Sequence, residues 1–386
     1  MEHTRTFARL PPRTAIIAAL LFGILDSAAL GQAETRGDFE LELPFDSRDV
    51  VYCNPNEGWA VGRYQSIVRT VDGGETWSLD ESAAALDRRP LNALALDGTA
   101  TVAVAVGQHE THQVLPTILF NLNLAGSSLW QPVEARQIDF VAEVSVIATE
   151  FRDVDWVSGQ EFWAVGREGL VVYSDPTTGV DQWRQFVPSN ETYSAFSDFD
   201  IDGVSFATGG HGVLVGSRIV NSKLTGKAYH AERTATGINW TEIPIPNESS
   251  LRALTDVDFD GTTAYATGIR DVVGGVQGVV LKATLSAGVF SDFIAVGQTF
   301  SECAIGDAAT AVPVLTEVEI APGGAIWVGG QCGKLWKSTD GGANWNSVRS
   351  QTDAHVRGMS FPAADTGFIA CHRQNRSGHC VIRIVP

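Results

Sequence analysis

The segment LWKSTDGGANW, residues 335–345, decides how the sequence is interpreted, and residues 70–77, TVDGGETW, repeat its pattern. Both contain Ser/Thr-x-Asp-x-Gly-x-x-Trp. In such a turn the aspartate accepts backbone N–H hydrogen bonds, glycine supplies a positive φ, and tryptophan packs against the sheet. We interpret both as structural Asp-box turns between two strands, without a catalytic role. The box residues are Asp72, Gly74, Trp77, Asp340, Gly342 and Trp345.

A second motif, an aromatic residue followed by Ala-Val-Gly or a near equivalent, recurs along the whole chain. An alternating strand precedes each copy, and two further strands follow the better-kept copies. Four strands in each of about seven repeats predict an all-β fold, a seven-bladed β-propeller with four-stranded antiparallel blades. Six blades are the alternative. The copies begin at Trp59, Val104, Trp163, Phe206, Tyr265, Trp327 and Phe368.

The last repeat ends one strand short. Phe39, Leu41 and Leu43 alternate with glutamates near the other end of the chain. We expect this N-terminal strand to complete the last blade, because closing the ring removes exposed sheet edges. Residues 34–386 should therefore form a single domain.

Residues 1–33 have the layout of a secretory signal peptide. Three arginines precede an apolar run over residues 15–25, and small residues lead to a cleavage site after Ala33. A membrane anchor is the alternative, although the apolar run is short for a membrane span. We expect a periplasmic or secreted protein that is not inserted in the membrane after cleavage.

Charge and cysteine content restrict the class of partner further. The 386 residues carry a net charge of −18, which argues against nucleic acid or an anionic membrane as the main partner. Five cysteines follow the leader. Their places in the repeats predict the disulfides Cys371–Cys380 and Cys303–Cys332, with Cys53 left over.

The Asp boxes, the Trp-Ala-Val-Gly strand and the Asp-Val-x-Phe-like strand before it resemble the photosystem II stability/assembly factor family. That family belongs to the Asp-box propellers, which also include sialidases. The resemblance implies an exported seven-bladed propeller without catalysis or cofactor, which helps to assemble a membrane-protein complex. Photosynthetic members are associated with a basic patch that recognises their client. We therefore expect a protein client and a monomer.

When the repeats are aligned, carboxylates recur at two positions of the first strand. If these strands are innermost, the carboxylates surround a central channel. They either bind a cationic group or are satisfied by backbone N–H groups and arginines of the next blade. The residues are Asp49, Asp153, Asp155, Asp198, Asp200, Asp256, Asp258, Glu317 and Glu319.

The loops between second and third strands should share one rim with the loops that enter the first strand. Long insertions are expected there, which makes this rim the candidate binding surface. The residues expected on it are Arg63, Arg167, Arg270, His109 and His211. No histidine or cysteine spacing predicts a metal site.

The enzymatic alternative is an Asp-box glycoside hydrolase, either sialidase-like or a two-carboxylate glycosidase. The sialidase Phe-Arg-Ile-Pro signature is absent from the sequence. Because nothing singles out two acting carboxylates, we predict a binding protein rather than an enzyme.

Overall fold

The computed structural model describes most of residues 47–384. The segments outside the description are 1–46, 64–65, 85–89, 109–116, 125–128, 135–136, 140–149, 176, 178, 187–197, 208, 235–236, 247–249, 274, 298–299, 301–302, 306–307, 312–313, 351, 373–378 and 385–386. The predicted leader, its cleavage site, the closing strand at residues 39–43 and His109 all lie in these segments.

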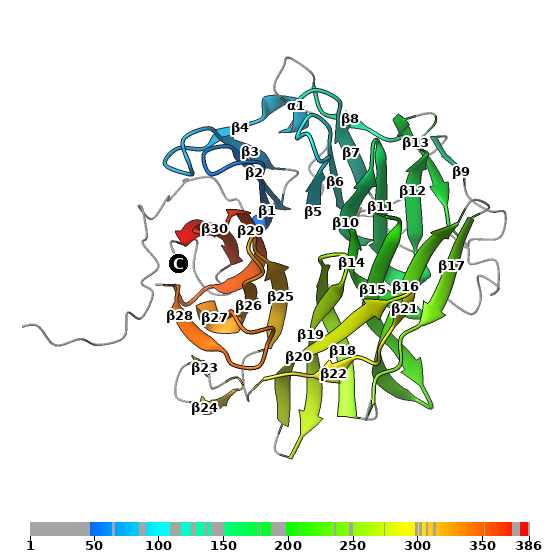
Figure 1. Cartoon of the computed structure of the whole chain (residues 1–386). Coiled ribbons are helices and arrows are strands. Elements are labelled where there is room, and N and C mark those ends of the chain that lie inside the picture. The colour runs from blue at the N-terminus through cyan, green and yellow to red at the C-terminus, as the bar shows by residue number, and fades with distance from the viewer. Residues whose placement is uncertain are drawn as a thin grey trace, which may run out of the picture. The chain divides into compact units, whose positions relative to one another are not determined.

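Seven antiparallel sheets follow one another along the described chain and form the blades of a propeller (Figure 1). Blade 1 contains β1 (Ser47–Tyr52), β2 (Gly58–Gly62), β3 (Ile67–Thr70) and β4 (Ser78–Leu79). Blade 2 contains β5 (Leu91–Leu96), β6 (Ala103–Gly107), β7 (Thr117–Asn121) and β8 (Gln131–Pro132). Blade 3 contains β10 (Phe151–Ser158), β11 (Glu161–Gly166), β12 (Val171–Asp175) and β13 (Gly179–Gln185), with β9 (Ile138–Asp139) parallel to β13.

Blades 4 and 5 have the longest strands. Blade 4 contains β14 (Phe199–Ala207), β15 (His211–Val220), β16 (Lys223–Thr234) and β17 (Gly237–Glu242). Blade 5 contains β18 (Leu251–Phe259), β19 (Thr263–Val272), β20 (Gly275–Ser286), β21 (Val289–Phe290) and β22 (Ile294–Ala295).

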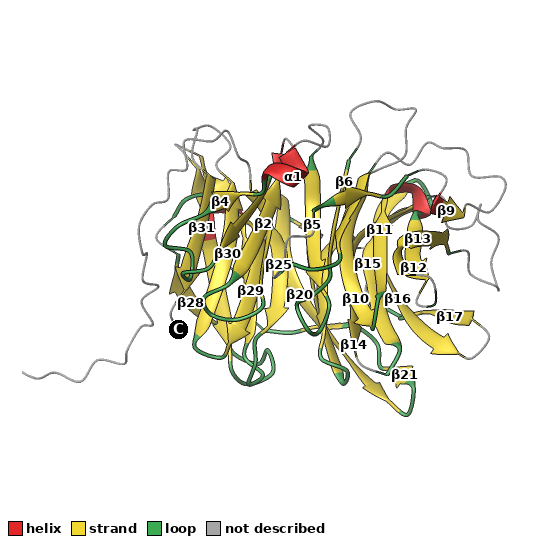
Figure 2. Ribbon diagram, turned by 90° about the horizontal axis from the view of Figure 1, so that it is seen from above, coloured by secondary structure: helices red, strands yellow, loops and turns green. Residues whose placement is uncertain are grey.

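Blade 6 contains β25 (Leu315–Ile320), β26 (Ile326–Gly330), β27 (Lys334–Ser338) and β28 (Asn346–Arg349), preceded by the hairpin of β23 (Cys303–Ile305) and β24 (Ala308–Ala311). Blade 7 contains β29 (His355–Ala363), β30 (Thr366–His372) and β31 (His379–Ile384). Helix is confined to α1 (Glu81–Ala84) and short 3₁₀ turns in the described chain, which is otherwise strands and loops (Figure 2). No helix in the described ranges is long and apolar enough to span a membrane.

The first strand of every blade lies innermost. Each of these strands contacts the first strand of the next blade, and β29 of blade 7 contacts β1, so the blades form a closed ring. The seven-bladed fold is therefore confirmed. The described part of blade 7 has three strands, and its completion by residues 39–43 stays a prediction.

The hydrophobic core lies between blades. Val104 and Phe120 of blade 2, for example, pack with Phe162 and Val172 of blade 3. The central residues of the repeated motif are buried because the second strand has neighbouring strands on both sides and packs against both adjacent blades. Each blade is therefore stable only as part of the ring.

The glycine of the motif is required by a close approach of two backbones. A Cβ atom on Gly166 would overlap the carbonyl oxygen of Glu150, which enters the inner strand of the same blade. Gly107 and Gly216 stand in the same relation to Pro90 and Asp200. The motif therefore marks where the end of the second strand crosses the start of the first.

In blade 4 the predicted register is wrong. Phe206 and Ala207, predicted to start the second strand, end the first strand β14. The motif position is occupied by Val213–Gly216 in β15 instead. The prediction was wrong because Phe206–Gly209, Phe-Ala-Thr-Gly, resembles the motif, whereas Val213–Gly216 at the motif position has no aromatic residue.

We predict that Gly166→Ala lowers the free energy of unfolding by about 1–3 kcal/mol, because the added methyl group must displace the entering strand. Urea unfolding followed by tryptophan fluorescence measures the effect. Gly159→Ala is the control, because Gly159 faces open space and has φ of 56°, so it measures backbone strain without the clash. Equal losses in the two variants would contradict the crossing constraint.

Candidate functional site

The seven inner strands present two equivalent positions to the centre of the ring. Every inner strand has a β-bulge near its start, and the residue after the bulge pairs with the residue before the motif glycine or its equivalent. This first position is occupied by Asp49, Ala93, Asp153, Gly203, Asp256, Glu317 and Gly358. The second position, two residues later, is occupied by Val51, Ala95, Asp155, Ser205, Asp258, Glu319 and Ser360.

Seven of the nine predicted carboxylates meet in one central cavity of about 190 Å³. They come from blades 1, 3, 5 and 6, whereas blades 2, 4 and 7 contribute alanine, glycine or serine at these positions. The predicted acidic channel therefore exists, with an uneven distribution of charge around it.

The aspartates of the first position tie neighbouring blades together. One oxygen of Asp153 accepts the N–H of Val154 at 2.8 Å, and the other accepts the N–H of Val204 in blade 4 at 2.8 Å. Asp256 likewise accepts the N–H of Val257 in its own strand and the N–H of Val318 in blade 6, each at 2.7 Å. Asp49 reaches Leu94 of blade 2 at 2.8 Å.

The second position repeats this arrangement. Asp155 accepts the N–H of Phe206 at 2.6 Å, and Asp258 accepts the N–H of Ile320 at 2.7 Å. Serine performs the same task at two further junctions. Ser205 accepts the N–H of Phe259 at 3.1 Å, and Ser360 accepts that of Tyr52 at 2.9 Å, which joins blade 7 to blade 1. We call these contacts the inter-blade clasp.

For the five aspartates of the channel, the clasp agrees with the prediction that backbone N–H groups satisfy the carboxylates. Each of these aspartates accepts backbone N–H hydrogen bonds through both oxygens. Burial nevertheless raises the pKa of Asp49 and Asp153 to about 7 and that of Asp155 to about 8. Burial, and then repulsion by neighbouring aspartates, raises the pKa of Glu317 and Glu319 well above the usual range.

Asp198 and Asp200 do not reach the cavity, which corrects the prediction. Asp198 pairs with Arg218 at 2.9 Å at the entrance to blade 4, and Asp200 lies 3.8 Å from Arg152. The motif in blade 4 was predicted at Phe206–Gly209 instead of Val213–Gly216, so the channel positions of the first strand were also predicted several residues too early. Gly203 and Ser205 stand at the central positions instead.

A larger cavity of about 390 Å³ opens at the mouth of the channel, where the inner strands begin. Its cationic side chains are Arg48, Arg63, Arg152 and Arg357, joined by His372. Several arginines are held in place by the next blade. Arg48 hydrogen-bonds Asn92, and Arg152 forms an ion pair with Asp202. We call this the arginine mouth; Glu150 and Glu317 also line it.

The predicted rim residues lie in different places. Arg63 lines the arginine mouth, and Arg167 lies beside it through an ion pair with Glu150 at 2.8 Å. Arg270 lies on β19, where it bonds Gln277 at 2.8 Å. His211 lies on the opposite rim, since it begins β15 and its Nδ1 is 3.0 Å from Nε2 of His230. The misplaced register of blade 4 explains this error as well.

Arg48, Arg152 and Arg357 also reach the rim, although the sequence did not predict them there; each stands one residue before the first channel position. The signal was their shared place beside the aligned carboxylates. The arginines are the extra, unpaired residues of the bulges, and they line the mouth while the carboxylates line the channel.

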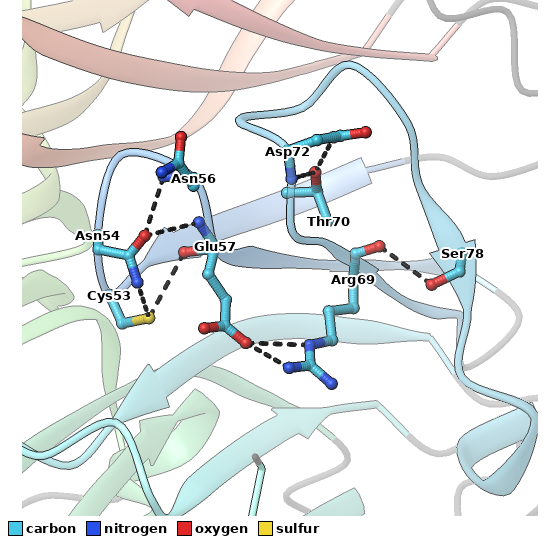
Figure 3. Close-up of polar contacts among 8 residues, drawn as sticks. All are labelled: Cys53, Asn54, Asn56, Glu57, Arg69, Thr70, Asp72 and Ser78. Atoms are coloured by element: carbon cyan, nitrogen blue, oxygen red, sulfur yellow. Dashed lines mark hydrogen bonds and ion pairs between the residues drawn. The ribbon is translucent and has the colours of Figure 1, made fainter.

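The Asp boxes form the predicted turns. Asp72 accepts hydrogen bonds from the Thr70 hydroxyl at 2.8 Å and the Thr76 N–H at 2.9 Å (Figure 3 shows the Thr70 contact). Asp340 makes the equivalent bonds to Ser338 and Asn344. Hydrogen bonds, led by those from Thr76 and Asn344, lower the pKa of both aspartates to about 2.

The cysteines behave consistently with the predicted pairs. Cys332 and Cys371 each take part in a disulfide bond. In the β30–β31 ladder the backbone of Cys371 lies opposite that of Cys380. The side chains of Cys303 and Cys380 lie outside the description, so the pairing stays a prediction. Cys53 is free and half-buried, and its thiol faces the carbonyl of Glu57 (Figure 3).

Fold and site define the class as a seven-bladed β-propeller with a carboxylate-lined centre and an arginine-lined mouth. No family model matches the chain. The sequence is 26% identical over 178 residues to the photosystem II assembly lipoprotein Ycf48 of Prochlorococcus marinus (strain MIT 9313), covering 46% of this chain and 47% of the relative. The match thus spans about half the length of that curated relative.

Solved structures of Ycf48 share the fold. Ycf48 bound to D1 peptide aligns with a TM-score of 0.58 and 14% identity over 92% of this chain and 98% of that one. YCF48 from Cyanidioschyzon merolae aligns with a TM-score of 0.59 and 18% identity, over 89% of this chain and 97% of that one. The WD40 propeller of Doa1 aligns with a TM-score of 0.55 and 10% identity, over 92% of this chain and 96% of that one. The predicted resemblance to photosystem II assembly propellers is therefore confirmed.

We predict that Ser360→Ala destabilises the ring by about 1–3 kcal/mol, because it leaves the Tyr52 N–H without its acceptor between blades 7 and 1. Chemical unfolding measures the loss. Ser347→Ala on the exposed outer strand of blade 6 is the control and should be neutral. An unchanged stability in Ser360→Ala would show that this clasp contact contributes nothing.

We also predict that the protein becomes less stable as pH rises from about 4.5 to 8. The folded pKa values of Asp49, Asp153 and Asp155, about 7 to 8, exceed the usual aspartate value of 3.8. Between these pKa values the folded chain binds more protons than the unfolded chain, so stability falls until the carboxyls are ionised in the folded chain as well. Thermal melting across this range tests the sign. Asp155→Asn should flatten the slope, and a melting temperature that rises with pH would refute the assignment.

Proposed function

We propose that this protein is an exported, non-catalytic propeller that binds a protein client and assists the assembly or stability of an envelope or membrane complex. The arginine mouth is the observation that carries the proposal. It lies in a fold shared with Ycf48, a photosystem II assembly lipoprotein whose structure is known in complex with a D1 peptide. We propose that this chain also binds a peptide of its client, and we make no proposal that the client belongs to photosystem II.

The chemistry of the arginine mouth suits an anionic group on the client. Guanidinium groups bind carboxylates through paired hydrogen bonds with defined geometry. The ion pair with Asp202 and the bond to Asn92 hold Arg152 and Arg48 in place before any partner arrives. Such preorganisation lowers the entropy lost on binding. The rim residues Arg63 and Arg167 complete this surface.

The state of the channel carboxylates supports a role without catalysis. A glycosidase needs two carboxyls that can exchange protons with substrate or water. Five of the channel aspartates engage both oxygens with backbone N–H groups that hold the blades together. We accordingly assign them to the scaffold. Export rests on the leader-like residues 1–33, and we propose a monomeric protein in the periplasm or secreted medium.

We predict that the double substitution Arg63→Glu/Arg357→Glu weakens client binding at least tenfold, because it replaces two cations of the arginine mouth with anions. Fluorescence anisotropy with a D1 peptide, and affinity capture from an envelope extract of the source organism, provide the measurements. Arg349→Glu, on an exposed strand outside the mouth, is the matched control.

Two results would overturn the proposal. Equal capture by wild type and the double variant would remove the arginine mouth from the binding surface. Turnover of a glycan panel that disappears in Asp155→Asn, together with the capture of no specific protein, would favour the hydrolase.

A further inference from the structure

Two hairpins of neighbouring blades rise above the ring. In blades 1, 2, 3 and 6 the described ladder between second and third strands stops at or before the motif glycine. The β15–β16 ladder continues for four residue pairs beyond Gly216, and the β19–β20 ladder for four pairs beyond Gly268. At about 3.3 Å per residue, each hairpin projects roughly 13 Å further. We call the described residues 217–226, 269–273 and 275–278 the paired tips.

The paired tips are joined to each other by ion pairs. Asn221 and Ser222 both have positive φ, 51° and 62°, as in the tight hairpin turn that fits twisted strands. Lys223 on the first tip lies 3.7 Å from Asp271 on the second, and Arg252 of β18 contacts the same carboxylate at 3.1 Å. The tips therefore form one unit on adjacent blades.

Large aliphatic side chains are exposed at the ends of this unit. Ile219 is 62% exposed and its cross-strand partner Leu224 is 42% exposed. On the other tip Val272 is 39% exposed and Val273 is fully exposed. Four exposed aliphatic residues at two joined turns form an apolar projection, which in a soluble chain indicates a contact with another apolar phase.

The charges around the tips differ in sign from those of the chain as a whole. Five cations, Arg218, Lys223, Lys227, Arg252 and Arg270, stand behind the apolar ends among the described residues. Four carboxylates stand among them: those of Asp198, Glu242 and Asp271 pair with four of the cations, and Asp200 lies opposite Ser217 of the first tip. The described surroundings of the tips are therefore net positive, in a protein of net charge −18.

The arginine mouth lies on the same rim, because both features stand where first strands begin and second strands end. The opposite rim carries the acidic turns of Asp72, Asp97, Asp260 and Asp340. The cations of the tips and of the mouth thus stand on one rim, which suits an anionic partner on that side.

We propose that the paired tips dock the propeller on the surface of a phospholipid bilayer, with the aliphatic ends in the interface and the cations at the headgroup phosphates. Apolar residues backed by cations suit an anionic lipid surface. The tips are convex and project beyond the blades, so a planar, deformable phase accommodates both, whereas a protein partner needs a matching recess. Docked in this way, the arginine mouth faces the membrane.

Vesicle flotation tests the proposal with phosphatidylcholine vesicles, with and without 30% phosphatidylglycerol. The wild-type protein should float with the anionic vesicles and much less with the neutral ones. Ile219→Asp and Val273→Asp should each lower the bound fraction roughly tenfold, because each places a charge where an aliphatic side chain entered the interface. Raising the salt concentration should also release the protein.

Val289→Asp is the matched control, since Val289 is 69% exposed but follows β20 at the end opposite its tip. It should bind vesicles as wild type does. Thermal melting of each variant separates loss of docking from loss of fold, and exposed sites should tolerate the change.

Three results would overturn membrane docking. They are no flotation of the wild type, flotation that is unchanged in Ile219→Asp and Val273→Asp, or tip-dependent capture of a protein by a chain that does not bind vesicles. The last result would assign the tips to a protein partner. Failure of docking and failure of client binding are distinguishable, because Ile219→Asp and Val273→Asp leave the arginine mouth intact and Arg63→Glu/Arg357→Glu leaves the aliphatic tips intact.

Discussion

The ring depends on hydrogen bonds from side chains of one inner strand to the backbone of the next. The strands of a blade satisfy each other, but neighbouring blades share no ladder, so the backbone groups that face the centre need other acceptors. Asp153, Asp256 and Asp49 provide them at three junctions, and Ser205 and Ser360 at two others. Packing between sheets supplies most of the cohesion, while the clasp fixes the position of each blade relative to the next.

The clasp has an electrostatic consequence. Seven carboxylates share a small cavity, and burial together with mutual repulsion opposes their ionisation. The same groups that align the blades therefore make the centre of the ring sensitive to pH. Such strain is tolerated because two backbone hydrogen bonds stabilise each clasping aspartate, and because blades 2, 4 and 7 carry no carboxylate there.

The β-bulge connects this framework to the candidate site. It separates the first channel position from the preceding residue, which turns toward the mouth. At that place Arg48 and Arg152 contact Asn92 and Asp202 of the next blade. The candidate site is thus built on the same strands that hold the ring together, and the longer hairpins of blades 4 and 5 extend the same rim.

The sequence by itself determined the propeller, its blade number, the Asp-box turns and most of the channel carboxylates. These features follow from local rules, because strand alternation, turn chemistry and a glycine at a backbone crossing recur in each repeat. Blade 4 shows the limit, since Phe206–Gly209 imitates the motif locally and only pairing with β15 reveals the correct register. The tertiary structure alone decided that Asp153 serves Val204 of another blade, that Arg48 and Arg357 meet at the mouth, and that His211 lies on the far rim. These relations join residues tens to hundreds of positions apart, and the closure of the ring, rather than any local preference, brings them together.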